Sequence, residues 1–231
     1  MYGGTSPSGH TTGTVAHSPV VPKQSRPLRR DAERNRERIL AAARELFVEQ
    51  GLDVGVEEIA RRAGVGMGTL YRRFPNKDAL IEAILRTVID HLRSMAEEVL
   101  ASEPPATALR TFFMRSITAE VCQWAFLSNR LWSGRTNDLL FTDVVPLVDQ
   151  MFIRAQQVGA LRSDVVLSDL LVLIRSMRVV LDVTADHAPG AWRRHLDILL
   201  DGFRPRPDAA ELDLPPVPFH VLAASSARPL V

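Results

Sequence analysis

The chain has 231 residues, 46% of them hydrophobic and 24% charged, which is long enough for one large helical domain or two smaller ones. The formal net charge of +1 indicates no partner by itself, but the charge is unevenly distributed. Residues 23–78 hold 13 basic and 9 acidic side chains, whereas residues 79–231 hold 15 basic and 18 acidic ones. This asymmetry is expected when only one end of a protein meets a polyanion.

A single cysteine, Cys122, excludes an intrachain disulfide and a cysteine-based metal cluster. The sequence shows no secretory signal and no apolar run of about 18 residues, so we expect a cytoplasmic protein without a membrane partner. It also lacks a Gly-rich phosphate loop, a Ser with an adjoining base and a metal-spaced set of ligands. We therefore expect no enzyme activity, no metal and no cofactor.

The first elements in chain order are a tail and a helix. Residues 1–27 are rich in Gly, Ser, Thr, Pro and His, which is typical of a disordered tail. Residues 31–50 are predicted to form a helix, because four apolar side chains share one face and Gly51 follows as a stop signal. These side chains are Ile39, Ala43, Leu46 and Phe47.

Two short helices joined by a tight turn are predicted over residues 56–63 and 66–73. Gly64 separates them, and Leu70 and Phe74 lie four residues apart on the inner side of the second helix. Helices this short need a brace, which the helix at residues 31–50 can supply. Their outer side is basic and hydroxyl-rich, which favours DNA as a partner. It carries Met67, Thr69, Arg72 and Arg73.

A long helix over residues 77–100 is predicted next, ending before Pro104 and Pro105. Further helices are predicted at 107–126, 127–132, 141–158, 167–183 and 189–203. No segment shows sustained strand alternation, so the fold class is all-α. The expected units are a disordered tail (1–27), a helix-turn-helix domain (28–76), a helical domain for dimerisation and ligand binding (77–204) and a Pro-rich tail (205–231). That last tail is either disordered or laid on a groove by Leu212, Leu214, Val217 and Phe219.

Residues 34–85 resemble the TetR family of transcriptional regulators. The likeness rests on RERILAAARELFVEQG followed by VEEIARRAGVGMGTLYRRFPNKDALIEAIL, and a looser one extends to QQVGALRSDV and AWRRHLDILLDGFRP. The resemblance implies a homodimer that presents one reading helix per subunit to a pseudo-palindromic operator. It also implies a repressor released when a small-molecule effector shifts the helix at 77–100. A ligand-independent or activating regulator, and a helical ligand-binding protein without operator activity, remain alternatives.

In that family the positions matching Gly66, Met67, Thr69 and Tyr71 lie at the DNA. The hydroxyls of Thr69 and Tyr71 can bond phosphate oxygens, and Lys77 can add a salt-sensitive phosphate contact. Arg72 and Arg73 can reach phosphates or guanine edges, although solvated arginines and a packed Tyr71 are the plain alternatives. Few side chains here can read base edges, so we expect backbone contacts and DNA shape to carry much of the specificity.

Apolar side chains in the C-terminal half are candidates for lining an effector cavity, with ordinary core packing as the alternative for each. Phe112 and Phe113 belong to this pool. The residues we assign to the ligand site are Trp124, Phe126, Trp132, Met151, Phe152 and Met177, which suit a small apolar or amphipathic effector. The last two helices hold more apolar residues than one pair needs, which favours a four-helix dimer interface. The excess comprises Leu170, Leu171, Ile174, Met177, Val180, Leu181, Leu196, Leu199, Leu200 and Phe203.

Overall fold

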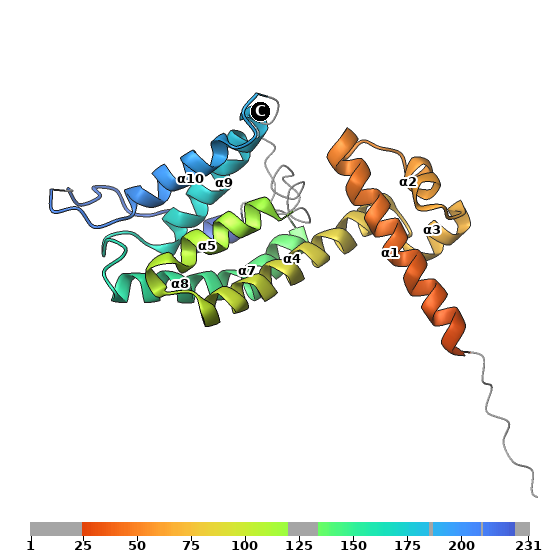
Figure 1. The fold of residues 1–231 in the computed structure, drawn as a ribbon, viewed down its shortest axis with the longest axis horizontal. Helices are drawn as coiled ribbons and strands as arrows, with labels where there is room; N and C mark the ends of the chain where they lie inside the picture. Colours follow the sequence, from red (N-terminus) through yellow and green to blue (C-terminus); the bar gives the residue numbers. More distant parts are fainter. Residues whose placement is uncertain (1–24, 120–133, 185–186, 209, 225–231) are drawn as a thin grey trace, which may run out of the picture.

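The structure, a computed structural model, describes residues 25–119, 134–184, 187–208 and 210–224. All regular elements in these ranges are helices, so the predicted all-α class is confirmed (Figure 1). The helices are α1 (Ser25–Gln50), α2 (Val56–Ala63), α3 (Met67–Arg73), α4 (Lys77–Ser102), α5 (Pro105–Thr118), α7 (Gly134–Asp143), α8 (Val145–Gln157), α9 (Leu167–Thr184), α10 (Ala191–Gly202) and α11 (Phe219–Ala224).

Helices α1 to α3 form a head at one end of the molecule, and α4 runs from it into a larger helical body (Figure 1). The head is held together by fully buried side chains, including Ile39, Leu46 and Ile59. Helix α1 begins at Ser25, six residues before its predicted start, and so includes the end of the predicted tail. Pro27 does not prevent this, because a proline is tolerated in the first turn of a helix, where backbone N–H groups have no partner.

Helix α4 belongs to both the head and the body. The Asn76 side chain caps its first turn, since Asn76 Oδ1 accepts a hydrogen bond of 2.8 Å from the Ala79 N–H. An apolar stripe along α4 is buried from Leu80 to Val99. The main core follows this stripe without a break, from Ile39 in the head to Phe203 in the body.

The body departs from the predicted helix bounds at two places. Helix α5 ends at Thr118, and the rest of the predicted 107–126 helix, together with the short 127–132 helix, lies outside the described residues. The predicted 141–158 helix is instead two helices, α7 and α8, which meet at Val144. Pro146 explains the break, because it has no N–H for the fourth preceding carbonyl and its ring crowds that group.

The C-terminal segment contacts the body between residues 210 and 224, but not through the side chains we expected, since Leu212 and Leu214 are 53% and 83% exposed and the buried anchor is Leu222. Near its start, the Ala210 carbonyl accepts a hydrogen bond from Arg162 Nη2 at 2.8 Å. The Leu212 N–H donates to Asp164 Oδ2 at 3.3 Å. Further along, α11 packs against α7 and α9. The predicted N-terminal tail up to residue 24 lies outside the described residues.

Candidate nucleic-acid interface and helical-body cavities

A left-handed glycine makes the turn between α2 and α3. Gly64 has φ +62° and ψ 40°, and its N–H bonds the Arg61 carbonyl at 3.1 Å. The Val65 N–H closes the turn on the Ala60 carbonyl at 3.0 Å. Arg38 of α1 donates to the Gly64 carbonyl at 3.3 Å, and a Cβ at position 64 would displace only the end of this flexible side chain. The turn therefore requires glycine on conformational grounds, because its φ is positive.

Helix α2 is fastened to α1 by ion pairs that we did not predict. Arg62 donates to both oxygens of Glu49, at 3.1 and 3.0 Å, and lies 3.5 Å from Glu45 Oε2. The hydrogen bond from Arg62 lowers the pKa of the Glu49 carboxyl below its usual value. These partners lie 13 and 17 residues apart in sequence. Only the packing of α1 on α2 brings them together.

The predicted DNA-contacting residues lie around the outward side of α3, opposite a buried anchor. Leu70 is only 1% exposed and fixes α3 on the head. Tyr71 is 46% exposed, and Arg72 and Arg73 are also exposed. Thr69 and Lys77, the first residue of α4, are half-buried at the edge of this surface. The fold thus gathers hydroxyl and cationic groups on one outward surface, an arrangement suited to phosphates.

Two of these side chains also make contacts within the head. Met67 is half-buried and packs against the main core, so only part of it faces outward. Arg72 folds along its own helix: Nε donates to the Gly68 carbonyl at 3.0 Å and Nη2 to Thr69 Oγ1 at 3.3 Å. This arrangement holds the guanidinium beside a hydroxyl, which places two potential phosphate ligands together.

The two glycines at the start of α3 are not required by packing within the chain. A Cβ built at Gly66 or Gly68 meets no atom within 4 Å. Neither glycine has a positive φ, since among the described glycines only Gly51, Gly64 and Gly159 do. Glycine at these positions instead leaves the backbone open to close approach from outside.

A small, partly open apolar cavity of about 40 Å³ lies between α4, α5, α7, α8 and α9 in the described part of the helical body. Among the described lining residues, Ser116 is the only polar one, and its hydroxyl donates to the Phe112 carbonyl at 2.6 Å. The candidates Phe112 and Phe113 both line this cavity. The other described lining residues are Leu92, Leu140, Val144, Val145, Val148, Leu171 and Ile174.

The assigned ligand residues that the structure describes lie in the core. Met151 and Met177 are fully buried and Phe152 is 3% exposed, and none of the three is among the described lining residues of the cavity. Trp124, Phe126 and Trp132 lie outside the described residues. No sequence pattern separates cavity-lining from core side chains, because both are apolar at helical spacing.

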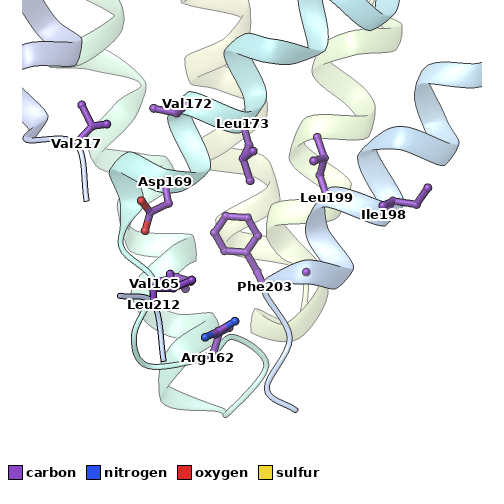
Figure 2. A pocket seen from close by; sticks show the side chains of 11 residues that line it. Arg162, Val165, Asp169, Val172, Leu173, Ile198, Leu199, Phe203, Leu212 and Val217 are labelled. Atoms are coloured by element: carbon purple, nitrogen blue, oxygen red, sulfur yellow. The ribbon is translucent and has the colours of Figure 1, made fainter. Parts of the chain in front are cut away.

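A second, larger hollow of about 420 Å³ lies on the outer side of α9 and α10, where the C-terminal segment forms one edge. Figure 2 shows Phe203 directed between Leu173 and Leu199, with Arg162 at one end and Val217 on the opposite side. Arg162 is paired with Asp164 and lowers the pKa of that carboxyl. Asp169 accepts a hydrogen bond from the Val166 N–H at 3.0 Å. The charged groups at this hollow thus have partners within the chain.

The apolar residues that we expected at a dimer interface are mostly internal. Leu170, Leu171, Ile174, Met177, Leu196 and Phe203 are buried within the single chain. They face inward because α9 and α10 pack on each other, while α10 also packs on α5. The exposed apolar side chains of the two helices are instead Val172 (37%), Val179 (54%), Val183 (70%) and Ile198 (56%).

Within the described residues, no group of three or more His, Cys, Asp or Glu side chains is placed to hold a metal ion. No described helix combines the length and the apolar character needed to cross a membrane.

Comparison with known proteins decides the family. The family model described as "Bacterial regulatory proteins, tetR family" matches residues 39–84. The crystal structure of a TetR transcription regulatory protein from Mycobacterium vanbaalenii is 31% identical, with a TM-score of 0.53, and the match covers 78% of this chain and 100% of that one. The chain belongs to the TetR family of transcriptional regulators.

Other relatives of this TetR-family chain agree with the assignment. A TetR transcriptional regulator from Streptomyces coelicolor is 33% identical with a TM-score of 0.53, covering 74% of this chain and 98% of its own. An HTH-type transcriptional regulator from Staphylococcus aureus strain MRSA252 is 40% identical over 82 residues, which are 34% of this chain. The chain spans only 42% of that curated relative. These proteins are transcription regulators in a family that is not enzymatic, as we expected for this chain.

Proposed function

We propose that this TetR-family regulator is a homodimeric repressor that binds a pseudo-palindromic operator and is released by a small apolar effector. The proposed binding of DNA rests on the outward surface of α3, where Thr69, Tyr71, Arg72 and Arg73 surround the buried Leu70. The free N–H groups at the start of α3 add favourable dipoles for phosphate. Lys77 extends the same surface from the start of α4.

The salt dependence of operator binding tests this role of Lys77. The slope of log K against log salt concentration is negative, and each phosphate contact removed reduces its magnitude by about 0.9. The magnitude should therefore fall by roughly 1.8 for a dimer that carries Lys77→Gln in both subunits, and by roughly 0.9 for a monomer. The operator is first obtained by binding-site selection with the wild-type protein.

Arg93→Gln is the matched control for this test. Arg93 is an exposed cation on the same helix, 16 residues or roughly 24 Å further along its axis. This variant should retain the wild-type slope. Equal slopes for Lys77→Gln and wild type would exclude a phosphate contact by Lys77, and failure to select any sequence would refute the regulator itself.

Support for the dimer comes from the exposed valines of α9 and Ile198 of α10, which lie on the two helices that pack together at the edge of the body. Exposed apolar side chains gathered on one helix pair favour association with a second copy. Val179→Asp should raise the dimer dissociation constant in analytical ultracentrifugation, whereas Val48→Asp should not. Val48 is an equally exposed valine (54%) on α1 in the head.

Support for an effector comes from the apolar cavity beside α4, because a ligand there would contact Leu92 of the helix that enters the head. The assigned residues Met151, Phe152 and Met177 belong to the main core, as do most of the described residues that line this cavity. The volume of about 40 Å³ equally favours a second candidate, a regulator that needs no ligand. Loss of operator affinity in the presence of neutral apolar compounds would distinguish the repressor with an effector from this alternative.

A further inference from the structure

Helix α11 covers the outside of the body through a small apolar cluster that is separate from the main core. Leu222 of α11 is 6% exposed and packs with Val145 of α8 and Leu171 of α9. The ring of Phe219 meets the ring of Phe141 of α7 edge-on, with centroids 5.2 Å apart. Arg175 Nη1 donates to the Leu222 carbonyl at 3.3 Å.

The cluster beneath α11 also forms part of the wall of the small apolar cavity described above. Val145 and Leu171, the two residues that hold Leu222, are among the residues that line the cavity. Leu222 therefore lies directly behind this part of the wall. Other lining residues, such as Phe112 and Ile174, are backed by the main core.

The cavity must enlarge before it can hold an organic ligand. Its volume of about 40 Å³ has room for only a few water molecules, since each needs at least about 10–15 Å³ of such space. Ligand sites for small molecules in proteins are roughly ten times larger, at about 300–1,000 Å³. Because protein interiors are close-packed, the added volume has to come from the displacement of a wall.

The α11 side is the wall that is easiest to move. Helix α11 has 6 residues, well below the roughly 12–15 at which an isolated helix becomes marginally stable in water. Its Phe219 and Val221 side chains remain 43% and 44% exposed. Among the described contacts, detaching it breaks those of Leu222 and Phe219 and the hydrogen bond from Arg175, whereas moving Phe112 would open the main core.

We propose that α11 is the displaceable wall of the effector cavity: a neutral apolar ligand gains its space by pushing Val145 and Leu171 outward and detaching α11. The ligand is neutral because the described lining offers no charged group, and the hydroxyl of Ser116 already donates to a backbone carbonyl. This inference rests on the effector cavity proposed above and adds how that cavity is opened and which ligands it admits.

A fluorescence titration with N-phenyl-1-naphthylamine, a neutral apolar dye, tests this wall in the full-length protein. If the ligand binds only to molecules in which α11 is detached, its apparent Kd is inversely proportional to the fraction of such molecules. A substitution that weakens the docking of α11 raises this fraction and lowers the Kd by the same factor. Leu222→Ala should therefore lower the dye Kd at least tenfold. Leu214→Ala makes the same change in the same segment at a side chain that is 83% exposed, and should leave the Kd unchanged.

A second variant and a second readout keep the test decisive. Phe219→Ala removes the ring contact with Phe141 and should also lower the Kd, with the far-UV circular dichroism of the body retained. Hydrogen exchange of the amides in residues 219–224 should become faster when the dye binds wild type. Unchanged exchange, an equal or higher Kd in both α11 variants, or no dye binding by any form would overturn the proposal.

Operator binding by the same samples separates this inference from the proposed function. If no form binds any selected DNA, the repressor is refuted, whatever the dye titration shows. If operator binding is intact but the dye affinities of wild type and both α11 variants agree, only the role of α11 is refuted.

Discussion

Gly68→Ala should make the protein more stable and, at the same time, a weaker operator binder. A glycine within a helix costs about 0.5–1 kcal/mol relative to alanine, and the new methyl group meets no atom within 4 Å. For a chain of this size the gain corresponds to a rise in Tm of roughly 1–4 °C. If the backbone of α3 approaches DNA closely at Gly68, the methyl group overpacks that contact at a cost of about 1–3 kcal/mol, or roughly 5- to 150-fold in Kd.

Differential scanning calorimetry and a fluorescence-anisotropy titration with operator DNA measure the two effects separately. Gly190→Ala is the control, because its Cβ makes only an ordinary 3.7 Å contact with Arg193 and it lies at the start of α10 in the body. The control should bind operator as wild type does. A Gly68→Ala protein with unchanged operator affinity would refute close approach of the α3 backbone to DNA.

Three further predictions concern stability. Asn76→Ala removes the cap of α4 and should cost about 1 kcal/mol in urea unfolding, whereas Asn76→Asp should cost much less. Gly64→Ala should cost about 1–2 kcal/mol, because alanine is strained at φ +62°; an unchanged urea midpoint would contradict the conformational requirement for glycine in this turn. The hydrogen bond from Arg162 lowers the pKa of Asp164 in the folded protein below its ordinary value of 3.8. The stability from this pair is therefore fully present above pH 3.8 and is lost as the pH falls through the lowered pKa. Proteolysis within residues 205–218 should therefore increase at low pH in wild type, and Asp164→Asn should show the increase already at pH 7.

The helices of the head could be predicted because their signals are local. The predicted bounds of 56–63 match α2, and α4 begins at the predicted Lys77. Apolar side chains at helical spacing, with glycines and a proline between the segments, set these bounds within a few residues of sequence. The contacts that hold the head together, such as Arg62 with Glu49, depend on how helices pack and have no local signal.

The tail and the body were less predictable for physical reasons. The six residues of α11 follow Pro215, Pro216 and Pro218, so composition alone favours disorder, and the helix is stabilised by its contacts with the body, chiefly the burial of Leu222. Cavity-lining Phe112 and core Met151 carry the same apolar signal, and the packing of five helices decides which one borders a cavity. The candidate DNA-contacting residues were predicted as a set, and their contacts with DNA stay predictions.

Helix α4 would act as a lever if the body moved, because its buried stripe runs from Leu80 to Val99. Its 26 residues span roughly 39 Å. Because bending the helix would disrupt the core packed along it, a displacement would tilt the whole helix as a rigid body. A tilt of about 5° at the body end would displace the head by roughly 3 Å over that length, close to the 3.4 Å rise of one base pair. In a two-fold dimer the displacements add, and the two α3 helices would lose register with successive major grooves while each head kept its internal contacts.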